Sequence, residues 1–520
     1  MHSHTLLLRL HCSPGDIRMF EKSFYLIAKM HNALVREMKK RLRMLYRDPV
    51  YKRHRHSYGR IRRLLDKKIS VKLRQYCEQE LEFHANVMNE RVKLYGLGKH
   101  DGEKFLLPMQ HKYKHYISST QMQKEAARVY AGVQKCLYKN GTSLHFKKLR
   151  DFKTIQGKSN KNGMRFFIDA MSVTMNRHTV SINDKKLQKV LDDKEHPISR
   201  EVQYRIEALQ GNVQYCELVR LMFMDGWHYY VRLYIAGPAP KKLIPGTGKA
   251  GIDPGMTTMA ASTPNRLFFE ELAPDVKQYN AIIAGLQSGI DISKRLSNPK
   301  NYNPDGTVKK GQHTWNYTDR CRYRQRKLVV TYRKKAAYVR QSHNTLANQI
   351  IQQASVFYIE DMNYTALARR SKNTTRSAKA STIQTKTGDK TIYKYKKKKR
   401  FGKSVQDRAP GMFLTILQTK CLQYGLQFMT IDTRSFKASQ YDHTTGTYKK
   451  IPLSQRTKQI GGHTVQRDLY SSFLQQHSVR NGTHPNQKEC KKDFHRFLQM
   501  QAQLVQDIHN NKKYIPNFGM

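Results

Sequence analysis

Apolar residues recur at two different spacings along the chain, and the changes of spacing divide it into three parts. Between residues 16 and 97 they recur every three or four positions, which predicts amphipathic helices. The first of these helices shows the pattern at Phe20, Phe24, Ile27, Met30 and Leu34. Residues 118–138 predict a further helix, with Ser119 or Thr120 as its N-cap. This part is therefore predicted to be a helical bundle, interrupted by a basic loop at residues 51–60.

Alternation of apolar and polar positions, which is typical of strands, precedes and follows the helical part. Residues 5–12 predict a first strand that ends at a Ser-Pro-Gly turn. Between residues 146 and 236 the alternation returns, and the Asp-Gly pair at 225–226 predicts the turn of a hairpin. A Gly-Pro-Ala-Pro-Lys-Lys segment at 237–242 then predicts a linker. The last domain is predicted to follow this linker.

The third part mixes the two patterns. In order, its predicted elements are a strand to residue 253, a strand at 257–262, helices at 275–296 and 317–353, a strand at 355–360, a helix at 410–424, a strand at 427–431 and a helix from 468. This order suits an RNase H-like mixed α/β sheet that is split by insertions. The whole chain is therefore predicted to be a multidomain α+β protein.

The charge of the chain indicates a nucleic-acid partner. Its 520 residues carry 95 Lys or Arg against 39 Asp or Glu, a formal net charge of +56. Self-repulsion on this scale opposes folding unless a polyanion shares the structure. Residues 369–403 hold fourteen Lys or Arg and one Asp, and we predict that they stay disordered until nucleic acid binds. The candidate phosphate contacts in this segment are Lys396, Lys397, Lys398, Lys399 and Arg400.

Cysteine usage and hydropathy indicate the compartment. The seven cysteines are scattered, with no Cys-x-x-Cys pair, which is typical of free thiols in a reducing compartment. The apolar run near the N-terminus is too short for a signal peptide, and no run approaches the ~18 apolar residues of a membrane span. We therefore expect a cytoplasmic protein that has no membrane partner and is associated with the nucleoid when bound to DNA.

Three acidic residues in this basic chain carry the candidate chemistry: Asp253, Glu360 and Asp468. Each ends or borders an apolar run, where a carboxylate is costly unless a cation neutralises it. If they converge, the three would form an oxygen-ligand site for Mg²⁺, which Mn²⁺ could also occupy. Two such ions about 4 Å apart activate a water and stabilise the leaving oxygen in phosphodiester cleavage. The acids therefore predict a metal-dependent nuclease.

The segments around these acids resemble motifs of the TnpB proteins of insertion sequences and of their relatives, the type V CRISPR effector nucleases. Gly-Ile-Asp-Pro-Gly at 251–255 resembles the first RuvC motif of that family, Tyr-Ile-Glu-Asp-Met-Asn at 358–363 the second, and Gln-Arg-Asp-Leu-Tyr-Ser-Ser at 466–472 the third. The resemblance is clear over residues 249–475 and fainter before residue 240. It implies that Asp253, Glu360 and Asp468 are catalytic Mg²⁺ ligands of one RuvC site.

The resemblance also implies a domain order and an activity. A helical recognition insert at 15–145 would interrupt a β-barrel wedge domain made of residues 1–14 and 146–240. A RuvC domain would span 249–432 and 466–520, the latter including a C-terminal tail. The activity would be RNA-guided cleavage of DNA in a prokaryote, in which the protein reads a short flanking motif and a guide RNA reads the rest of the target.

Two departures from the family pattern lie near the third motif. The family has Asn two positions after the third acid, where this chain has Tyr470. The family also carries a zinc ribbon of two Cys-x-x-Cys pairs, whereas residues 433–465 contain no cysteine. Asp442, His443 and His463 would supply at most three poor ligands, and structural zinc needs four. We therefore expect a ribbon-like lobe without zinc.

Two other functions are compatible with the same motifs. One is a nuclease-inactive, RNA-guided DNA-binding repressor, although decay of a nuclease usually removes at least one acid. The other is a guide-independent DDE-type transposase or recombinase, which would join strands. A basic structural RNA-binding protein would leave the three acids unexplained. A guide from a transposon end and a guide from a CRISPR array both fit the motifs.

Overall fold

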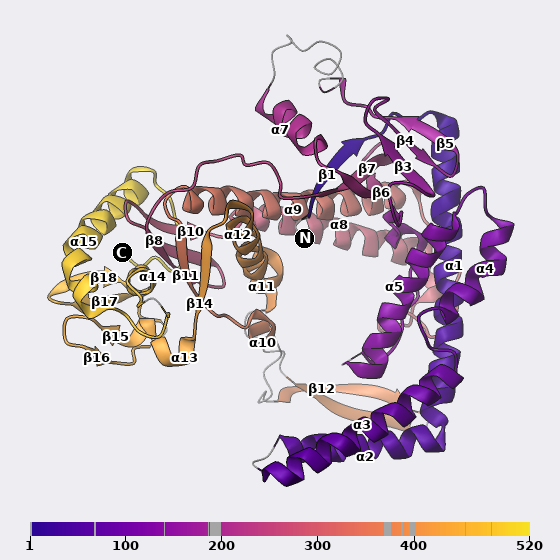
Figure 1. Ribbon diagram of the computed structural model, residues 1–520, viewed down its shortest axis with the longest axis horizontal. Coiled ribbons are helices and arrows are strands. Elements are labelled where there is room, and N and C mark those ends of the chain that lie inside the picture. The colour runs from indigo at the N-terminus through magenta and orange to yellow at the C-terminus, as the bar shows by residue number, and fades with distance from the viewer. Residues whose placement is uncertain are drawn as a thin grey trace. The chain divides into compact units, whose positions relative to one another are not determined.

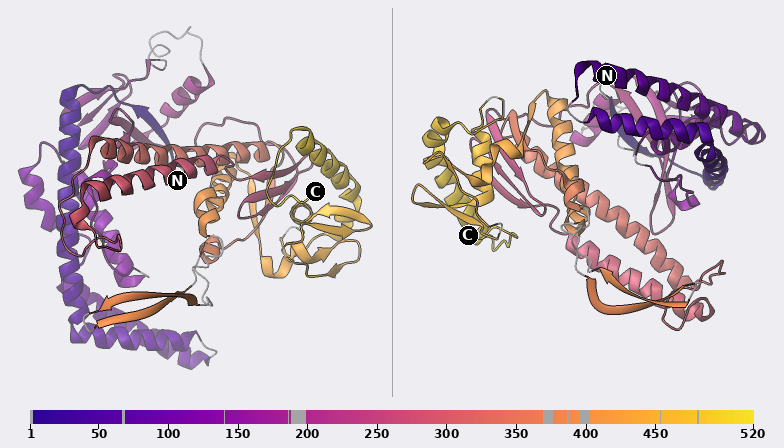
Figure 2. Two further views of the ribbon diagram at one scale, coloured as in Figure 1. Left: turned by 180° about the vertical axis from the view of Figure 1, so that it is seen from behind. Right: turned by 90° about the horizontal axis from the view of Figure 1, so that it is seen from below.

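The structure is a computed structural model of the chain, shown in Figures 1 and 2. It describes residues 3–66, 69–139, 141–185, 187, 199–368, 376–385, 388–395, 402–452, 454–479 and 481–520. The chain divides into two compact units, residues 1–240 (unit 1) and residues 241–520 (unit 2). The boundary falls within the predicted linker at 237–242. Every helix in the described ranges is too short or too polar to cross a membrane.

The described part of unit 1 includes the helices α1 (Pro14–Arg47), α2 (Pro49–Leu65), α3 (Val71–Leu94), α4 (Asp101–Lys112) and α5 (Ser119–Tyr138). The helical pattern is confirmed, but the basic loop predicted at residues 51–60 is wrong, because these residues lie inside α2. Asp48 starts that helix by accepting a hydrogen bond from the Tyr51 N–H at 2.8 Å, and Pro49 follows at the first helical position. The N-cap of α5 is also corrected: it is Ser118, in a capping box with Gln121.

Strands of unit 1 form two sheets. The first contains β1 (Ser3–Arg9), β2 (Thr154–Gln156), β6 (Val213–Met222) and β7 (Trp227–Ala236) in the antiparallel order β1-β7-β6-β2. The second contains β3 (Met164–Phe167), β4 (Ser172–Met175) and β5 (His178–Ser181). A bridge between Leu10 and Ile182 connects them. The predicted turn at Asp225 is confirmed, whereas the strand pattern did not predict α7 (Arg200–Leu209).

A five-stranded sheet is the centre of unit 2. Its strands are β8 (Lys249–Pro254), β9 (Thr258–Ser262), β10 (Leu267–Glu271), β11 (Val356–Glu360) and β14 (Gln427–Ile431), in the order β10-β9-β8-β11-β14. β8, β11 and β14 are parallel neighbours, and β9 runs antiparallel to β8 and to β10. The sheet is therefore mixed, with the first strand at its centre.

Helices cover both faces of this sheet. On one face, α9 (Asp319–Ile351) and α12 (Pro410–Tyr424) pack against β8 and β11 through Ile350 and Phe413. On the other face lie α14 (Arg467–Gln476) and α15 (Gln487–Asn510), which contribute Leu469 and Phe497 to a second core. α8 (Val276–Ser297) and α9 form the long insertion between β10 and β11 and lie side by side (Figure 2). The sequence did not predict β10 or α15.

The basic segment contains regular structure. After α10 (Tyr364–Ala368), β12 (Arg376–Thr385) and β13 (Gly388–Tyr395) form an antiparallel hairpin, and α11 (Gly402–Arg408) follows. These two strands lie where the sequence predicts a loop. β-branched residues pair across the hairpin, as Thr382 does with Thr391, and this local preference for strand outweighs the basic composition.

Residues 433–465 form a lobe of short elements. They include α13 (Thr433–Phe436), β15 (Tyr441–Asp442), β16 (Thr447–Tyr448), β17 (Thr457–Ile460) and β18 (His463–Gln466), of which the last runs into α14. β15 pairs with β16, and β17 with β18. The C-terminal residues return to the sheet, where the rings of Phe518 and Phe269 lie 5.1 Å apart.

Candidate active site

The first two candidate acids lie next to each other at one edge of the five-stranded sheet. Asp253 is near the end of β8, and Glu360 is the last residue of β11. The strands are parallel and pair Ile252 with Ile359, so the following residue of each carries its carboxylate to the same edge. The chain then reverses into β9, as the Asp-Pro-Gly turn predicts.

Helix α14 brings the third acid to this edge. Asp468 is in its first turn, which Gln466 caps by accepting a hydrogen bond from the Leu469 N–H at 2.7 Å. The helix lies directly on β8 because Gly251 has no side chain. A Cβ atom at Gly251 would lie 2.0 Å from the backbone oxygen of Ser472. The glycine of the first motif therefore permits the close contact that places Asp468 near Asp253.

Burial and mutual repulsion raise the pKa values of two of these acids. The pKa of Asp253 lies well above its usual range, first because of burial and then because of the charges of Glu360 and Asp468. Burial, followed by the charge of Asp468, raises the pKa of Glu360 to about 7. The structure thus places the three predicted acids within electrostatic range of one another.

Arg467 supplies a positive charge to this group. Its Nε and Nη2 atoms donate hydrogen bonds to Oδ1 of Asp468 at 2.9 and 2.8 Å, and its Nη1 donates to the backbone oxygen of Gln455 at 3.2 Å. The same guanidinium lowers the pKa of Asp253, although by less than the other groups raise it. Arg467 therefore neutralises part of the acidic charge.

Tyr364 is a residue of this site that the sequence analysis missed. It begins α10, and its hydroxyl donates a hydrogen bond to the backbone oxygen of Pro254 at 3.2 Å. Burial, followed by the charges of Asp253 and Glu360, raises the pKa of Tyr364. Its only signal in the sequence is its position four residues after Glu360, which by itself indicates no role.

The chemistry of the donor set fits a divalent metal ion. Carboxylates are the hard oxygen ligands that Mg²⁺ and Mn²⁺ take, and a 2+ charge would relieve the repulsion that raises the pKa values of Asp253 and Glu360. In the described side-chain arrangement, with Asp468 paired to Arg467, no group of three His, Cys, Asp or Glu residues is placed to hold an ion. Coordination by all three acids would therefore require their side chains to rearrange.

The three weak zinc ligands considered from the sequence have other partners. Asp442 Oδ1 accepts hydrogen bonds from the N–H and hydroxyl of Thr444 at 2.8 and 2.6 Å. The backbone N–H of His443 donates to the Tyr470 hydroxyl at 3.1 Å, and the His443 Nδ1 atom lies 2.8 Å from that oxygen. Burial lowers the pKa of His443 to about 4. His463 makes an edge contact with the ring of Phe494.

The phosphate contacts predicted in the basic segment fall outside the described residues. These are Lys396, Lys397, Lys398, Lys399 and Arg400. Their role in binding nucleic acid stays a prediction.

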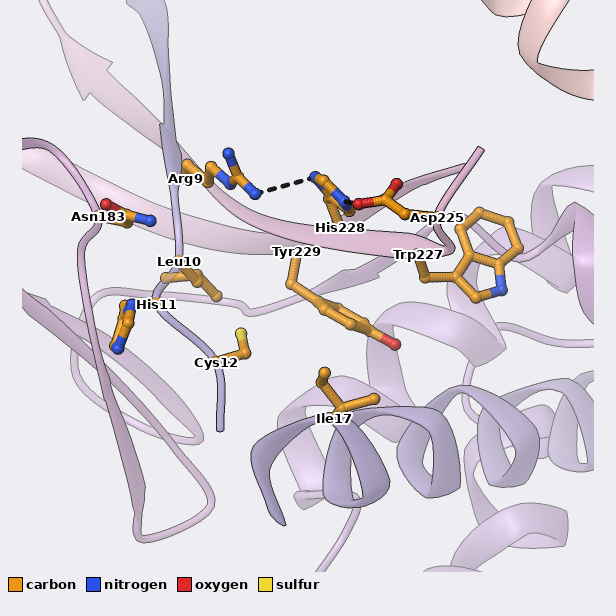
Figure 3. Close-up of a pocket in the computed structure, with 10 residues that line it drawn as sticks. All are labelled: Arg9, Leu10, His11, Cys12, Ile17, Asn183, Asp225, Trp227, His228 and Tyr229. Atoms are coloured by element: carbon orange, nitrogen blue, oxygen red, sulfur yellow. Dashed lines mark hydrogen bonds and ion pairs between the residues drawn. The ribbon is translucent and has the colours of Figure 1, made fainter. Parts of the chain in front are cut away.

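A pocket of about 300 Å³ in unit 1 offers a second arrangement of polar groups (Figure 3). Its His228 lies between Arg9 and Asp225, with Nδ1 3.1 Å from Arg9 Nη2 and Nε2 2.7 Å from Asp225 Oδ2. Both ring nitrogens are therefore engaged. Burial raises the pKa of Cys12, which also lines the pocket, to about 12. This arrangement supplies neither an available base nor a thiolate at neutral pH.

Comparisons with known proteins give weak structural similarities. No protein-family model matches the chain, and no curated protein matches it. Solved structures that align with it include the Cas12f1–sgRNA–target DNA complex, at 9% identity and a TM-score of 0.42 over 91% of this chain and 98% of that one. A CRISPR-Cas12f ternary complex aligns at 10% identity and a TM-score of 0.26 over 90% and 98%. A Cas12i(E894A)–crRNA–dsDNA complex aligns at 10% identity and a TM-score of 0.24 over 94% and 65%.

Proposed function

We propose that this chain is an RNA-guided DNA endonuclease. Its active site, formed by Asp253, Glu360 and Asp468, cuts phosphodiester bonds of the DNA. The proposal rests on Asp253 and Glu360, whose raised pKa values come from burial and from like charges nearby, among them that of Asp468. Such an arrangement costs folding free energy when no cation is bound, and perturbed carboxylates of this kind cluster at functional sites.

Under this proposal unit 2 contains an RNase H-like RuvC domain, and unit 1 is a wedge domain with a helical recognition insert. The order β10-β9-β8-β11-β14 supports the first assignment, because it sets the strands of the first two motifs side by side. The pairing of β1 with β7 supports the second. With these strands paired, α1 to α5 form an insertion between two strands of one sheet.

The carboxylates would hold Mg²⁺, or Mn²⁺ in its place, which supplies the charge that activates water and stabilises the leaving oxygen. The chain itself fixes the geometry. Asp253 and Glu360 are held by neighbouring strands, and Asp468 is held by a helix that rests on β8. Tyr364 fixes the turn after Asp253 through its hydrogen bond to Pro254. Because carboxylates that lose their charge bind metal poorly, the raised pKa values favour cleavage at neutral to alkaline pH.

Guidance by RNA is supported by charge and by the motifs. A net charge of +56 far exceeds what a small substrate requires and suits a protein that holds both RNA and DNA. The three motifs resemble those of nucleases in which a guide RNA pairs with the target, while the protein reads a short flanking motif.

The test begins with the RNA that co-purifies with the protein. A discrete species with one variable end supports guiding, and heterogeneous RNA contradicts it. The RNA-loaded protein is then given plasmids that carry a matching target beside a randomised flank, with Mg²⁺ or with EDTA. Mg²⁺-dependent cutting confined to a few flanks supports the proposal. Target binding without cutting would support the repressor, and strand joining without a guide would support the transposase.

A further inference from the structure

A second pocket in unit 1, of about 610 Å³, has a strongly basic lining. It lies where the segment between α4 and α5 meets the sheet β3-β4-β5. Its basic residues are Lys114, His115, Lys161, Arg165 and Arg177, and the remaining lining residues are Ser118, Gly163, Met164, Phe167, Thr174 and Asn176. The lining contains no carboxylate. We refer to it as the basic pocket.

Hydrogen bonds hold the walls of the basic pocket together. The Asn176 side chain, in the turn between β4 and β5, donates to the backbone oxygen of Tyr116 at 2.7 Å and to Gln121 Oε1 at 3.2 Å. Gly163 (φ +79°) approaches the start of α5 so closely that a Cβ there would lie 2.3 Å from the Ser118 hydroxyl oxygen. These contacts join the sheet to α5. The pocket is therefore preformed, which lowers the entropy cost of binding.

The turn residues direct a further cation to the pocket. Asn176 and Arg177 both have positive φ angles, of 50° and 70°. Consecutive left-handed residues are those of the tight hairpin turn that matches the twist of two strands. Arg177 is exposed at this turn and lines the pocket. A residue other than glycine adopts a positive φ only at a cost in free energy. The hairpin offsets this cost and holds Arg177 in that conformation.

The cations of the basic pocket have no acidic partner in the described part of the chain. No salt bridge in that part of the chain involves Lys114, Lys161, Arg165 or Arg177, although all four side chains are exposed. The Arg165 guanidinium instead lies 4.4 Å from the centroid of the Phe167 ring. An exposed group of like charges attracts a polyanion, and an aromatic ring beside it offers a surface for stacking a base.

We propose that the basic pocket binds consecutive phosphates of a nucleic-acid strand, with Phe167 beside one of its bases. A volume of about 610 Å³ exceeds what one phosphate fills and lies in the range of pockets for larger ligands. The cations come from three separate segments, so they can contact successive phosphates. Guide RNA and target DNA share this chemistry. The identification of the bound strand as guide or target rests on the proposed function.

The test uses the full chain in EDTA, so that binding is measured without cleavage. The variant Lys161→Gln/Arg165→Gln/Arg177→Gln is compared with Lys99→Gln/Lys104→Gln/Lys139→Gln, which removes the same charge from exposed sites of unit 1 outside the pocket. Binding of a labelled 30-nucleotide RNA is followed by fluorescence anisotropy over a salt titration. In a second arm, guide-loaded protein binds a matching labelled DNA. A further variant, Thr174→Glu, adds a negative charge to the pocket without removing a cation.

We expect the pocket variant to bind at least about tenfold more weakly in one arm. The slope of the logarithm of its binding constant against the logarithm of salt concentration should be smaller by about 2, because each lost phosphate contact reduces this slope by ~0.7. Thr174→Glu should weaken binding in the same arm, and the control by less than about threefold. Loss in the RNA arm assigns the pocket to the guide, and loss in the DNA arm alone assigns it to the target. Wild-type binding by both pocket variants in both arms would overturn the proposal, whether or not the wild-type protein cuts DNA.

Discussion

Arg467 donates two hydrogen bonds to a single oxygen, Oδ1, of its neighbour Asp468, at 2.9 and 2.8 Å. The same side chain also donates to the backbone oxygen of Gln455, just before β17 of the lobe. One arginine thus joins the candidate metal ligand on α14 to the lobe that precedes this helix. A metal ion and Arg467 would compete for the same carboxylate, because both are attracted by its charge.

Replacing Arg467 by Met removes this competing charge and keeps a long side chain. We expect Mn²⁺ to bind the nucleic-acid-free Arg467→Met variant about tenfold more tightly than the wild-type protein, because the acids lose a neighbouring cation. The measurement is an electron paramagnetic resonance titration of free Mn²⁺. Arg467→Lys keeps the charge and is the control. Weaker binding by the Met variant would show that Arg467 helps to hold Asp468 in place.

Removal of any one of the three acids should abolish cleavage and leave nucleic-acid binding nearly intact. Asp253→Ala, Glu360→Ala and Asp468→Ala should each lower the single-turnover rate by about 10²-fold or more, because the metal contributes several kcal/mol to the transition state. Binding is retained because each change also removes a negative charge beside phosphate. Asp361→Ala is the matched control, since Asp361 follows Glu360 but is exposed. Near-normal cutting by Glu360→Ala would transfer the candidate role to Asp361.

The raised pKa of Glu360 makes the stability of the metal-free protein depend on pH. The value is about 7 in the folded protein and about 4.3 in an unfolded chain, so the folded state binds more protons between these values. The unfavourable contribution of Glu360 is therefore absent below about pH 4 and complete above about pH 7. Glu360→Gln should raise the melting temperature at pH 8, and this gain should shrink toward pH 4. Asp361→Asn is the control. An equal gain at all pH values would contradict the pKa assignment.

Features that depend only on residues close together in the chain could be predicted from the sequence. The helix at residues 410–424 has the predicted bounds, because Pro410 can begin a helix and Gly425, with φ of 72°, can end one. The strand that follows, Gln427–Ile431, also has the predicted bounds. The loop predicted at 51–60 is wrong because the N-cap at Asp48 starts a helix despite the basic composition of the segment.

Features that depend on contacts between segments far apart in the sequence could not be predicted in the same way. The acids were identified because each lies in a motif of its own. Tyr364 has no motif, and its contact with Pro254 exists only because β8 and β11 are neighbours. The partner of His443 is equally distant, since Tyr470 lies 27 residues further along the chain. The raised pKa values also depend on burial, which no single segment determines.

Tyr470, two residues after Asp468, links α14 to the lobe. Tyr470→Phe would leave the buried N–H of His443 without its acceptor, which should cost about 1–3 kcal/mol and lower the melting temperature. Tyr448→Phe is the control, because the Tyr448 side chain is 48% exposed.

A zinc chelator should leave the wild-type melting temperature unchanged, and zinc analysis should give well under one atom per chain. Stoichiometric zinc would show that the lobe depends on Asp442, His443 and His463.

Gly251 allows α14 to rest on β8, and this contact should decide the position of Asp468. In Gly251→Ala the new methyl group would lie 2.0 Å from the backbone oxygen of Ser472 and 2.3 Å from the backbone nitrogen of Gln476. Because both atoms belong to the backbone of α14, the helix itself must move to relieve the clash. We expect a loss of about 3 kcal/mol or more in the free energy of unfolding. Cleavage per folded molecule should also fall, because Asp468 moves with the helix.

Gly285→Ala provides the matched control. Gly285 lies inside α8, and a Cβ atom there would meet nothing within 4 Å. Alanine at this exposed helical position should raise stability by about 0.5–1 kcal/mol. Denaturant unfolding followed by circular dichroism separates stability from activity, and single-turnover cleavage is then normalised to the folded fraction. If Gly251→Ala folded and cut like the wild-type protein, the helix could shift without displacing Asp468, and the close packing of α14 on β8 would not be what positions the third acid.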